Sequence, residues 1–386
     1  MITVVKRIYT DKTFLVTLGL AIVALIFGQV SPKDIDSHTI LALLSLLVIV
    51  TIYGQLHVLT YIANTIVAKC RTTRDIFGVM LLFSFIGSMF FTNDVAILTL
   101  VPIFFKISKQ INIGKIVPIS LLTIYANLGS ALTPFGNPQN LYLVSYYHLS
   151  LPHFMTLSPP IGVLGFLSLG IVTLFFPAQP IPAMTTTVPP IDQRKVSWLL
   201  VATVIVLLGI LSILPIWLAV GVSLLAAGLL DRQVLVKVDY GILLMFINFF
   251  IIVGAISRLP AIHHLLSFTT DTTLKTFFAG VISSQVISNV PAAVLLSKFT
   301  THVTGLYLGV TVGGLGTLIA SLANLLALRQ YQLFDHERSS YRFFKTFTWL
   351  NVVYLVIFMV IGSLICLWLN KKATKSYLVA FLLSGL

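Results

Sequence analysis

Long apolar stretches alternate with short polar joints along nearly all 386 residues of the chain. The stretches are continuous runs of Leu, Ile, Val and Phe, without the alternation of apolar and polar positions that barrel strands show. Because a crossing helix needs about 20 apolar residues, the pattern predicts an all-α polytopic membrane protein. We expect about nine crossing helices, near residues 14–30, 38–54, 115–147, 158–176, 196–213, 215–230, 238–257, 305–333 and 346–369.

Two further apolar runs, residues 76–107 and 274–304, have polar residues at their centres. Each run is too long for one helix. An arm of about 15 residues rises only about 22 Å, whereas the hydrocarbon core is about 30 Å thick. We therefore expect two re-entrant helical hairpins, each of which enters and leaves the membrane on the same side.

The composition supports an integral membrane protein. Hydrophobic residues make up 58% of the chain and charged residues 9%, and the mean hydropathy is +1.02. The net charge of +13 would suggest nucleic acid as a partner of a soluble chain, but cationic loops explain the excess here, and we expect no nucleic-acid partner. The two cysteines, Cys70 and Cys366, lie far apart and predict neither a disulfide framework nor a zinc site.

The basic residues predict the orientation in a bacterial-type inner (plasma) membrane. If the first hairpin returns to its side of origin, the basic residues before and after it, such as Arg71 and Lys109, fall in the cytoplasm. Most of the 24 Lys and Arg and the N-terminus then lie inside, as the positive-inside rule requires. Lys371, Lys372 and Lys375 fall outside and run against this bias.

An internal repeat connects the two halves of the chain. "FFTNDVAILTLVPIF" is answered in the second half by "VISNVPAAVLLSKF", which matches Asn93 to Asn289. "NLGSALTPFGNPQNLYL" is answered by "VGGLGTLIASLANLLAL", which matches Gly129 to Gly313, Thr133 to Thr317 and Asn140 to Asn324. Each half therefore reads helix, helix, amphipathic connector, hairpin, broken helix, helix, and one extra crossing makes the halves face opposite ways.

The predicted organisation follows from this repeat. Residues 1–176 form the first inverted repeat, with its hairpin at about 76–107 and its broken helix at 115–147. Residues 177–213 form a linker loop and a connecting helix. Residues 214–370 form the second repeat, with its hairpin at about 274–304 and its broken helix at 305–333, and residues 371–386 form a C-terminal tail.

Gly and Pro interrupt the two broken helices: Gly129, Pro134, Gly136 and Pro138 in the first, Gly313, Gly314 and Gly316 in the second. Bare backbone groups are not tolerated in hydrocarbon, so an interrupted helix persists only where protein or a wet cavity surrounds it. The N-terminal ends that a break exposes suit anions, and the freed carbonyls suit small cations. Close helix packing is the alternative role of the glycines.

Asp94 is the one acid of 11 near the centre of an apolar run, and an intramembrane acid indicates a functional site. At the hairpin tip it can bind Na⁺ together with Asn93 and freed carbonyls, or exchange a proton. Capping the second arm is the structural alternative. The second tip has Val290 in place of the acid, so a cation there would depend on Ser288, Asn289 and carbonyls. We expect Lys298 to extend to the membrane interface.

At these residues the chain resembles the ion transporter superfamily, which includes arsenite permeases, D-type sodium/proton antiporters and divalent anion/sodium symporters. The resemblance covers essentially the full length and is carried by the tips "TND" and "SNV" and by the broken helix "NLGSALTPFGNPQN". The dicarboxylate symporters tend to have Ser-Asn-Thr at both tips. The acid at one tip followed by "GNPQN" looks more like the arsenite-permease and antiporter branches, including small anion-permease-like proteins.

The resemblance implies two hairpins that meet two broken helices around a central site, in a homodimer whose transport domains move in an elevator-like manner. Carried over residue by residue, the substrate and ion site comprises Thr92, Asn93, Asp94, Thr133, Gly136, Asn137, Asn140, Ser288, Asn289, Thr317, Ser321 and Asn324. Within it, Asn93, Asp94 and Asn289 are the candidate Na⁺ ligands.

The leading hypothesis is a secondary transporter that moves a small anion across the bilayer with Na⁺ or H⁺ as the coupling ion. The alternatives are a sodium/proton antiporter and an arsenite permease that works with a separate ATPase. No Walker-type loop and no grouping of His, Asp or Glu typical of a membrane enzyme is visible in the sequence, so we expect neither enzymatic activity nor a cofactor beyond the coupling ion.

Overall fold

The computed structural model describes the chain except for residues 1–7, 10, 183–189, 336–339 and 385–386. The described residues form helices joined by loops, with one isolated β-bridge between Thr72 and Pro180 and no strand. The all-α prediction is confirmed. Among the described residues, four helices are long and apolar enough to cross a membrane singly: α3 (Ser37–Gln55), α5 (Thr73–Phe91), α11 (Gln193–Ile210) and residues 340–369 of α20 (Ser340–Ser384).

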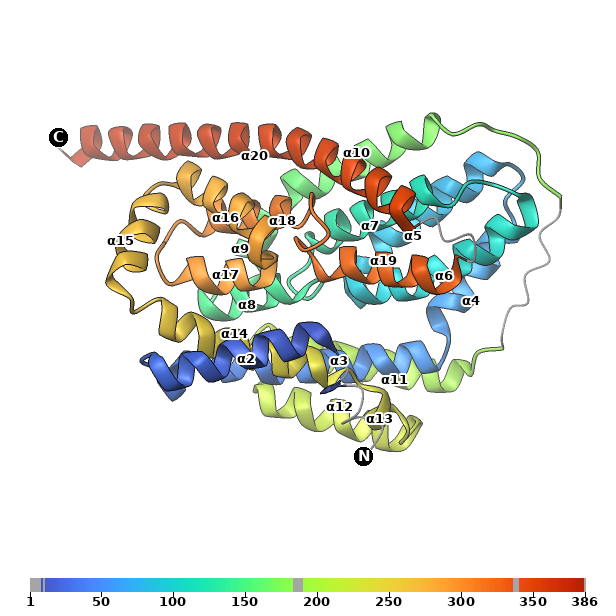
Figure 1. Ribbon diagram of the computed structural model, residues 1–386, viewed down its shortest axis with the longest axis horizontal. Coiled ribbons are helices and arrows are strands. Elements are labelled where there is room, and N and C mark those ends of the chain that lie inside the picture. Colours follow the sequence, from blue (N-terminus) through green and yellow to red (C-terminus); the bar gives the residue numbers. More distant parts are fainter. Residues whose placement is uncertain (1–7, 10, 183–189, 336–339, 385–386) are drawn as a thin grey trace.

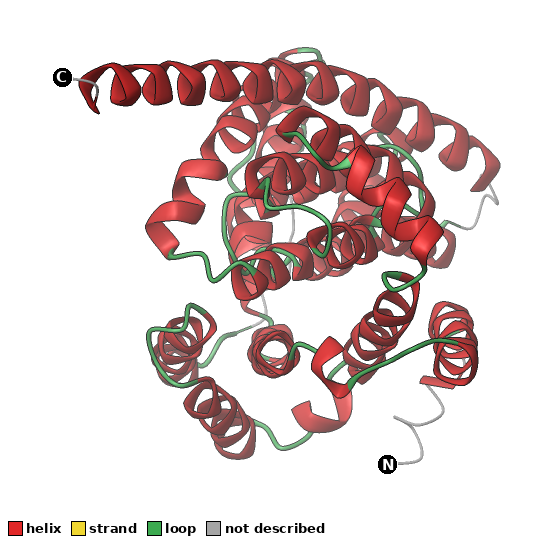
Figure 2. Cartoon of the chain, turned by 90° about the vertical axis from the view of Figure 1, so that its left-hand side faces the viewer, coloured by secondary structure: helices red, strands yellow, loops and turns green. Residues whose placement is uncertain are grey.

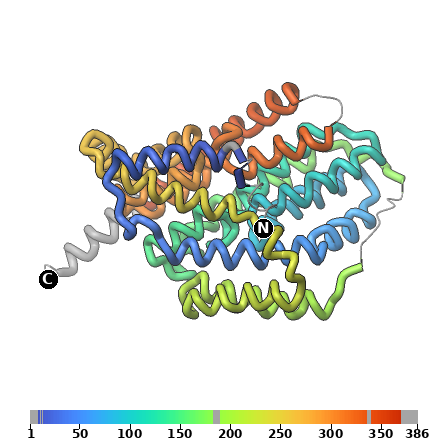
Figure 3. The backbone as a smooth tube through the Cα atoms, turned by 60° about the horizontal axis from the view of Figure 1, so that its bottom comes forward, coloured from blue at the N-terminus to red at the C-terminus, as the bar shows by residue number. Residues whose placement is uncertain are grey.

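The helices pack in two layers (Figure 1). One layer, called the support layer below, lies at the bottom of Figure 1 and in the foreground of Figure 3. It consists of α2 (Lys12–Phe27), α3 (Ser37–Gln55), α11 (Gln193–Ile210), α12 (Ile216–Leu230), α13 (Val234–Lys237) and α14 (Tyr240–Ile256).

The second layer, called the hairpin layer, holds the two hairpins and the two broken helices. The hairpins are α5 (Thr73–Phe91) with α6 (Asn93–Ile111) and α16 (Thr273–Ile287) with α17 (Asn289–Ser297). The broken helices are α7 (Ile116–Ser130) with α8 (Pro138–Tyr146) and α18 (Val303–Gly313) with α19 (Leu322–Phe334). Figure 2 shows the two layers from the side.

Short helices connect the layers, and long ones cover the outer side of the hairpin layer. The connectors are α4 (Val58–Val67) and α15 (Pro260–Thr269), which turns by 100° from α14. The 3₁₀ helix η1 (Pro32–Asp34) joins α2 to α3, and α9 (Leu151–Leu157) leads into α10 (Pro159–Leu174). With α20 (Ser340–Ser384), this order repeats the predicted succession of helix, helix, connector, hairpin, broken helix and helix in each half.

Local sequence determines where the hairpins begin. Thr72 accepts a hydrogen bond from the Asp75 N–H while the Asp75 carboxylate accepts one from the Thr72 N–H, a capping box that starts α5. Thr272 caps α16 at the matching point of the second half, by accepting a hydrogen bond from the Lys275 N–H. Each first arm thus has a defined start.

The first hairpin has longer arms than predicted, so the prediction of arms of about 15 residues was wrong for it. Its arms have 19 residues each, whereas those of the second hairpin have 15 and 9. Arms of 19 residues rise about 28 Å. The capping box explains the longer first arm, because it starts α5 before the apolar run that was recognised in the sequence. The last helix also differs, since α20 extends to Ser384 as one helix of 45 residues instead of ending near 369.

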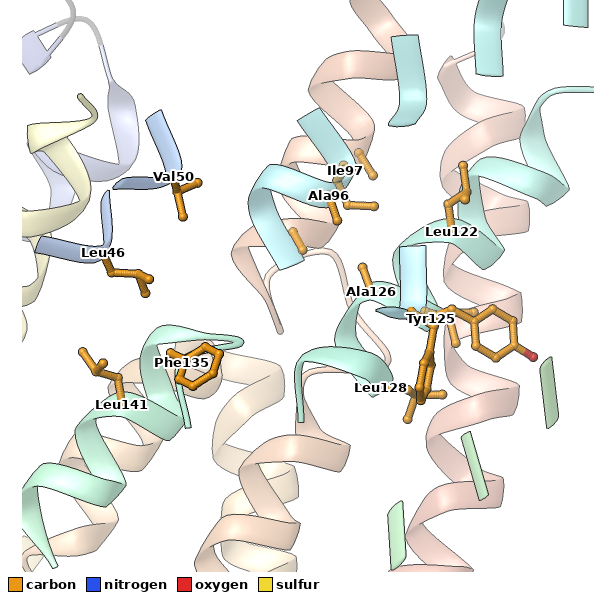
Figure 4. Close-up of a cluster of buried hydrophobic side chains, with 14 of the residues drawn as sticks. Leu46, Val50, Ala96, Ile97, Leu122, Tyr125, Ala126, Leu128, Phe135 and Leu141 are labelled. Carbon is orange, nitrogen blue, oxygen red and sulfur yellow. The ribbon is translucent and has the colours of Figure 1, made fainter. Parts of the chain in front are cut away.

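Apolar side chains fill the space within and between the layers. Figure 4 shows Leu46 and Val50 of α3 on the side that faces Phe135 and Leu141 of the hairpin layer. Within the hairpin layer, Tyr125 of α7 is fully buried, and its hydroxyl lies 2.7 Å from that of Tyr354 in α20. The broken helix is therefore enclosed by protein, as an interrupted helix in a membrane requires.

Gly129 lies inside α7 and does not interrupt it, whereas Gly313 is the last residue of α18, directly before the second break. A Cβ atom on Gly129 would lie 2.0 Å from the Phe85 carbonyl oxygen of α5. Close packing of a hairpin arm on a broken helix therefore explains Gly129, which corrects its predicted role as a breaker.

We predict that Gly129→Ala destabilises the protein, because α5 and α7 must separate to accommodate the methyl group. The expected cost is about 1–3 kcal/mol, measured as a lower midpoint of thermal unfolding in detergent. Gly170→Ala in α10 is the matched control, since a Cβ there meets nothing within 4 Å. Equal midpoints for the two variants would contradict the packing role.

Candidate functional site

The two hairpin tips have the same unusual backbone. Thr92 and Ser288 each form the whole turn between the arms, with φ of 70° and 75°. Positive φ is strained for residues other than Gly, and most so for β-branched Thr, at a cost on the order of 1–3 kcal/mol. Surrounding contacts must therefore hold both tips in place.

Each tip is hydrogen-bonded to the break of its own repeat. The Asn93 N–H donates to the Gly136 carbonyl at 3.1 Å, and the Asn289 N–H donates to the Ala320 carbonyl at 2.9 Å. Gly136 is required here, because a Cβ atom would lie 2.2 Å from the Ser130 carbonyl oxygen. These hydrogen bonds thus fix each hairpin tip and the break of the same repeat relative to each other.

The matched threonines tie the breaks to the first arms. The Thr133 hydroxyl donates to the Met89 carbonyl of α5 at 2.6 Å, and the Thr317 hydroxyl donates to the Gln285 carbonyl of α16 at 3.3 Å. Met89 and Gln285 each precede the tip asparagine of their hairpin by four residues. The structure therefore repeats this contact in both halves.

The matched asparagines bind the carbonyls that the breaks leave free. The Asn140 side-chain amide donates to the carbonyls of Ser130, Ala131 and Thr133 at 3.2, 3.3 and 2.9 Å. The Asn324 amide donates to the carbonyls of Gly314 and Thr317 at 3.1 and 2.9 Å. Both side chains are fully buried behind the site, so their contacts are structural.

Asn127 joins the two repeats and was not singled out in the sequence. Its Oδ1 accepts from Asn93 Nδ2 at 2.9 Å and from Ser321 Oγ at 3.0 Å, and its Nδ2 donates to Asn324 Oδ1 at 3.0 Å. It lies on α7 and is the first residue of the motif "NLGSALTPFGNPQN". A polar residue in the apolar run "TIYANLG" was the available signal. The corresponding position of the second repeat holds Thr311, so this node occurs once.

A cavity of about 440 Å³ lies between the tips and the support layer. Six of the predicted residues line it, namely Asn93, Asp94, Asn137, Ser288, Asn289 and Ser321. Gln139 lines it too, although it was not among them. The other six, Thr92, Thr133, Gly136, Asn140, Thr317 and Asn324, are not in the lining. Half of the predicted residues therefore form the surface of the cavity, and the other half lie outside its lining and support it.

The opposite wall of the cavity comes from α2 and α14 and is mostly apolar. It includes Leu20, Met245, Phe246 and Phe249, with Thr13 and Thr17 as its polar members. No Lys, Arg or His is among the described residues that line the cavity. Any charge that enters must therefore be balanced by backbone dipoles, Asp94 or a second ion.

Four helices begin at this cavity. The first residues of α6, α17 and α19 and the residues on either side of the α8 start, Asn137 and Pro138, all line it. Asn137 caps α8 by accepting from the Asn140 N–H at 3.0 Å. Because helix N-termini carry partial positive charge, two from each repeat together make an electropositive surface without basic side chains.

Asp94 is the acid of this surface. It lies in the first turn of α6 and is 7% exposed, and its Oδ1 is buried with no hydrogen-bond partner among the described residues. The cap residue of α6 is Thr92, so Asp94 is not the helix cap that the structural alternative required. Gln139 Oε1 is likewise buried and without a partner.

These oxygens fit a small hard cation. Oxygen atoms of carboxylates and amides are the ligands of such ions, and Asp94 Oδ1 and Gln139 Oε1 are unpaired acceptors that line the same cavity as Asn289. Asn93 is less available than predicted, because its amide is engaged with Asn127 and its Oδ1 accepts from the Asp94 N–H at 3.0 Å.

The comparisons with known proteins agree with this architecture. Residues 4–304 match the model of a family described as citrate transporter, CitMHS. The chain belongs to this family. It is 31% identical over 322 residues to the inner membrane protein YbiR of Escherichia coli, which covers 82% of this chain and 85% of that protein. It is also 31% identical over 329 residues to the uncharacterized transporter MJ0456 of Methanocaldococcus jannaschii, covering 82% and 88%.

A solved structure shows the same fold. The YdaH transporter of Alcanivorax borkumensis, described as having an unusual topology, aligns with a TM-score of 0.54 at 14% identity, over 94% of this chain and 99% of that one. Together with the helices and the family, these findings identify the chain as a multi-pass membrane transporter of the ion transporter superfamily.

We predict that Asn127→Ala lowers the thermal unfolding midpoint, since Asn93 Nδ2, Ser321 Oγ and Asn324 Oδ1 each lose the buried partner that Asn127 supplies. An unpaired buried polar group costs about 1–3 kcal/mol. Asn248→Ala is the control, because that buried amide has one side-chain partner among the described residues, Thr17, at 3.2 Å. The expected decrease is larger for Asn127→Ala, and a decrease no larger than that of the control would argue against a central node.

Proposed function

We propose that the protein is a secondary active transporter that moves a small anion, coupled to Na⁺ or H⁺ bound near Asp94. The observation that carries the proposal is the convergence of four helix N-termini and one buried carboxylate on a single cavity. The family description of citrate transporter supports an anionic substrate.

The electrostatics explain why anion and cation bind together. The N-terminal dipoles of α6, α8, α17 and α19 favour an anion, whereas the carboxylate of Asp94 opposes it. Neutralising Asp94 with Na⁺ or a proton removes this repulsion and supplies the partner that its buried Oδ1 lacks. Binding of the anion therefore depends on prior or simultaneous binding of the cation, which is the requirement for symport.

The layered architecture supports alternating access of the elevator type. The site belongs to the hairpin layer on one side and to α2 and α14 of the support layer on the other. Movement of the hairpin layer past the support layer would carry the tips across the membrane as one unit, because hydrogen bonds hold tips and breaks together. We further propose a homodimer in a bacterial-type inner membrane, with the N-terminus in the cytoplasm.

The direct test uses purified protein in sealed liposomes with a trapped pH dye. A sodium pulse is applied with and without a panel of small anions that includes citrate, and anion uptake is followed with radiolabel. Uptake that requires both one anion and a cation gradient is expected. Proton movement on sodium alone, with no anion, would instead establish a sodium/proton antiporter.

We predict that Asp94→Asn abolishes cation-dependent uptake, with a decrease of about tenfold or more, because the amide removes the charge that a coupling cation must balance. Asp271→Asn is the matched control, since Asp271 is exposed and forms an ordinary surface pair with Lys275 at 2.8 Å. Wild-type coupling in Asp94→Asn would remove this residue from the mechanism.

A further inference from the structure

An ion pair joins the two layers at one end of α2. Lys298 Nζ lies 3.1 Å from Asp34 Oδ1. Asp34 ends η1, in the connection from α2 to α3 of the support layer, and Lys298 caps the C-terminus of α17 in the hairpin layer. Lys298, which was expected to extend to the membrane interface, has a side chain that is 20% exposed. It therefore bonds across the boundary between the layers.

The support layer holds Asp34 in a single position. Arg258 binds both carboxylate oxygens, with Nη1 at 2.8 Å from Oδ2 and Nη2 at 2.9 Å from Oδ1. The same guanidinium donates to the carbonyls of Gln29 and Gly254 at 2.6 Å. A Cβ on Gly254 would lie 2.5 Å from Asp34 Oδ2, so this close approach requires Gly. Such bidentate pairing leaves little freedom to the carboxylate.

The carboxylate is charged and shielded from water. Burial raises the pKa of Asp34, but hydrogen bonds from Arg258, the Ser31 N–H and Lys298 outweigh it and lower the pKa to about 2. The Asp34 side chain is 6% exposed. Because the pair is partly buried, solvent and salt screen it less than they screen an exposed pair.

The helix α17 links the ion pair to the cavity. α17 has nine residues, with Asn289 at its start in the cavity lining and Lys298 at its end. A second bond lies at the same end, where the Ser145 hydroxyl at the end of α8 donates to Asp36 Oδ2 at 2.8 Å. α8 and α17 both begin at the cavity. At their C-terminal ends, both are bonded to the segment that connects α2 to α3 of the support layer.

We infer that Asp34, with Arg258 behind it, and Lys298 form an ionic latch that holds the hairpin layer against the support layer, and that this latch opens in each transport cycle. The inference rests on the proposed function, because only relative movement of the layers requires such a bond to break. At the other end of α2, Asp11 and Arg329 of α19 also pair across the layers, at 3.4 Å, with side chains 33% and 51% exposed. That pair is the weaker of the two.

The test measures how often the cavity opens in the purified protein in detergent, without any substrate. Cys70 and Cys366 are replaced by Ala, and Val253→Cys places one thiol in the cavity wall of α14, where the native side chain is 4% exposed. The rate of its reaction with a hydrophilic maleimide is the readout. Because no anion or gradient is used, a failure of the latch and a failure of the transport proposal are distinguishable.

Lys298→Gln is expected to increase the labelling rate about threefold or more, since loss of one shielded ion pair shifts the population toward open states. Lys298→Arg, which keeps the charge, is expected to restore the slow rate. Lys275→Gln is the matched control, because it removes a lysine that pairs with Asp271 within one layer and is expected to leave the rate unchanged.

Two results would overturn the latch. One is labelling of Lys298→Gln at the rate of the parent protein. The other is an increase that Lys275→Gln shares to the same extent, which would indicate general loosening. Thermal unfolding of every variant is measured alongside, and faster labelling at an unchanged midpoint supports the latch.

Discussion

The structure depends on the satisfaction of backbone hydrogen bonds where two helices are interrupted inside the hairpin layer. Free carbonyls at such depth are costly, because hydrocarbon offers them no donor. Asn140 and Asn324 supply the donors from the second halves of the broken helices, and Thr133 and Thr317 bind the interruptions to the hairpin arms. The breaks persist because these side chains replace the missing helical bonds.

The same solution creates a binding surface. Each break ends one helix and starts another, and each hairpin tip starts a further helix, so four N-termini meet at one cavity. Their N–H groups give positive potential in a cavity whose described lining has no Lys, Arg or His. The features that permit the fold and those that suit an anion therefore arise at the same two breaks and two hairpin tips.

The two repeats share a frame but differ in their chemistry. The first has Asp94 where the second has Val290, and Asn127 where the second has Thr311. Asn127 consequently binds across to Ser321 and Asn324, whereas Thr311 has no amide to bind back in the same way. An inverted repeat thus holds one acid and one central amide, which makes the two sides of the cavity chemically unequal.

Much was determined by the sequence itself: the helical class from long apolar runs, the two hairpins from their polar centres, the repeat from matched motifs, and Asp94 from its place in an apolar run. These features follow from local composition and spacing, which a linear chain displays. The tertiary structure alone decided that Asn140 and Asn324 support the site from behind, that Asn127 links the halves, and that Lys298 pairs with Asp34. Asn127 and Asn324, like Lys298 and Asp34, are far apart in sequence, whereas Asn140 and Asn324 bind carbonyls of the nearby irregular breaks. A hydrogen bond or an ion pair depends on distance in space, which only the folded path of the chain sets.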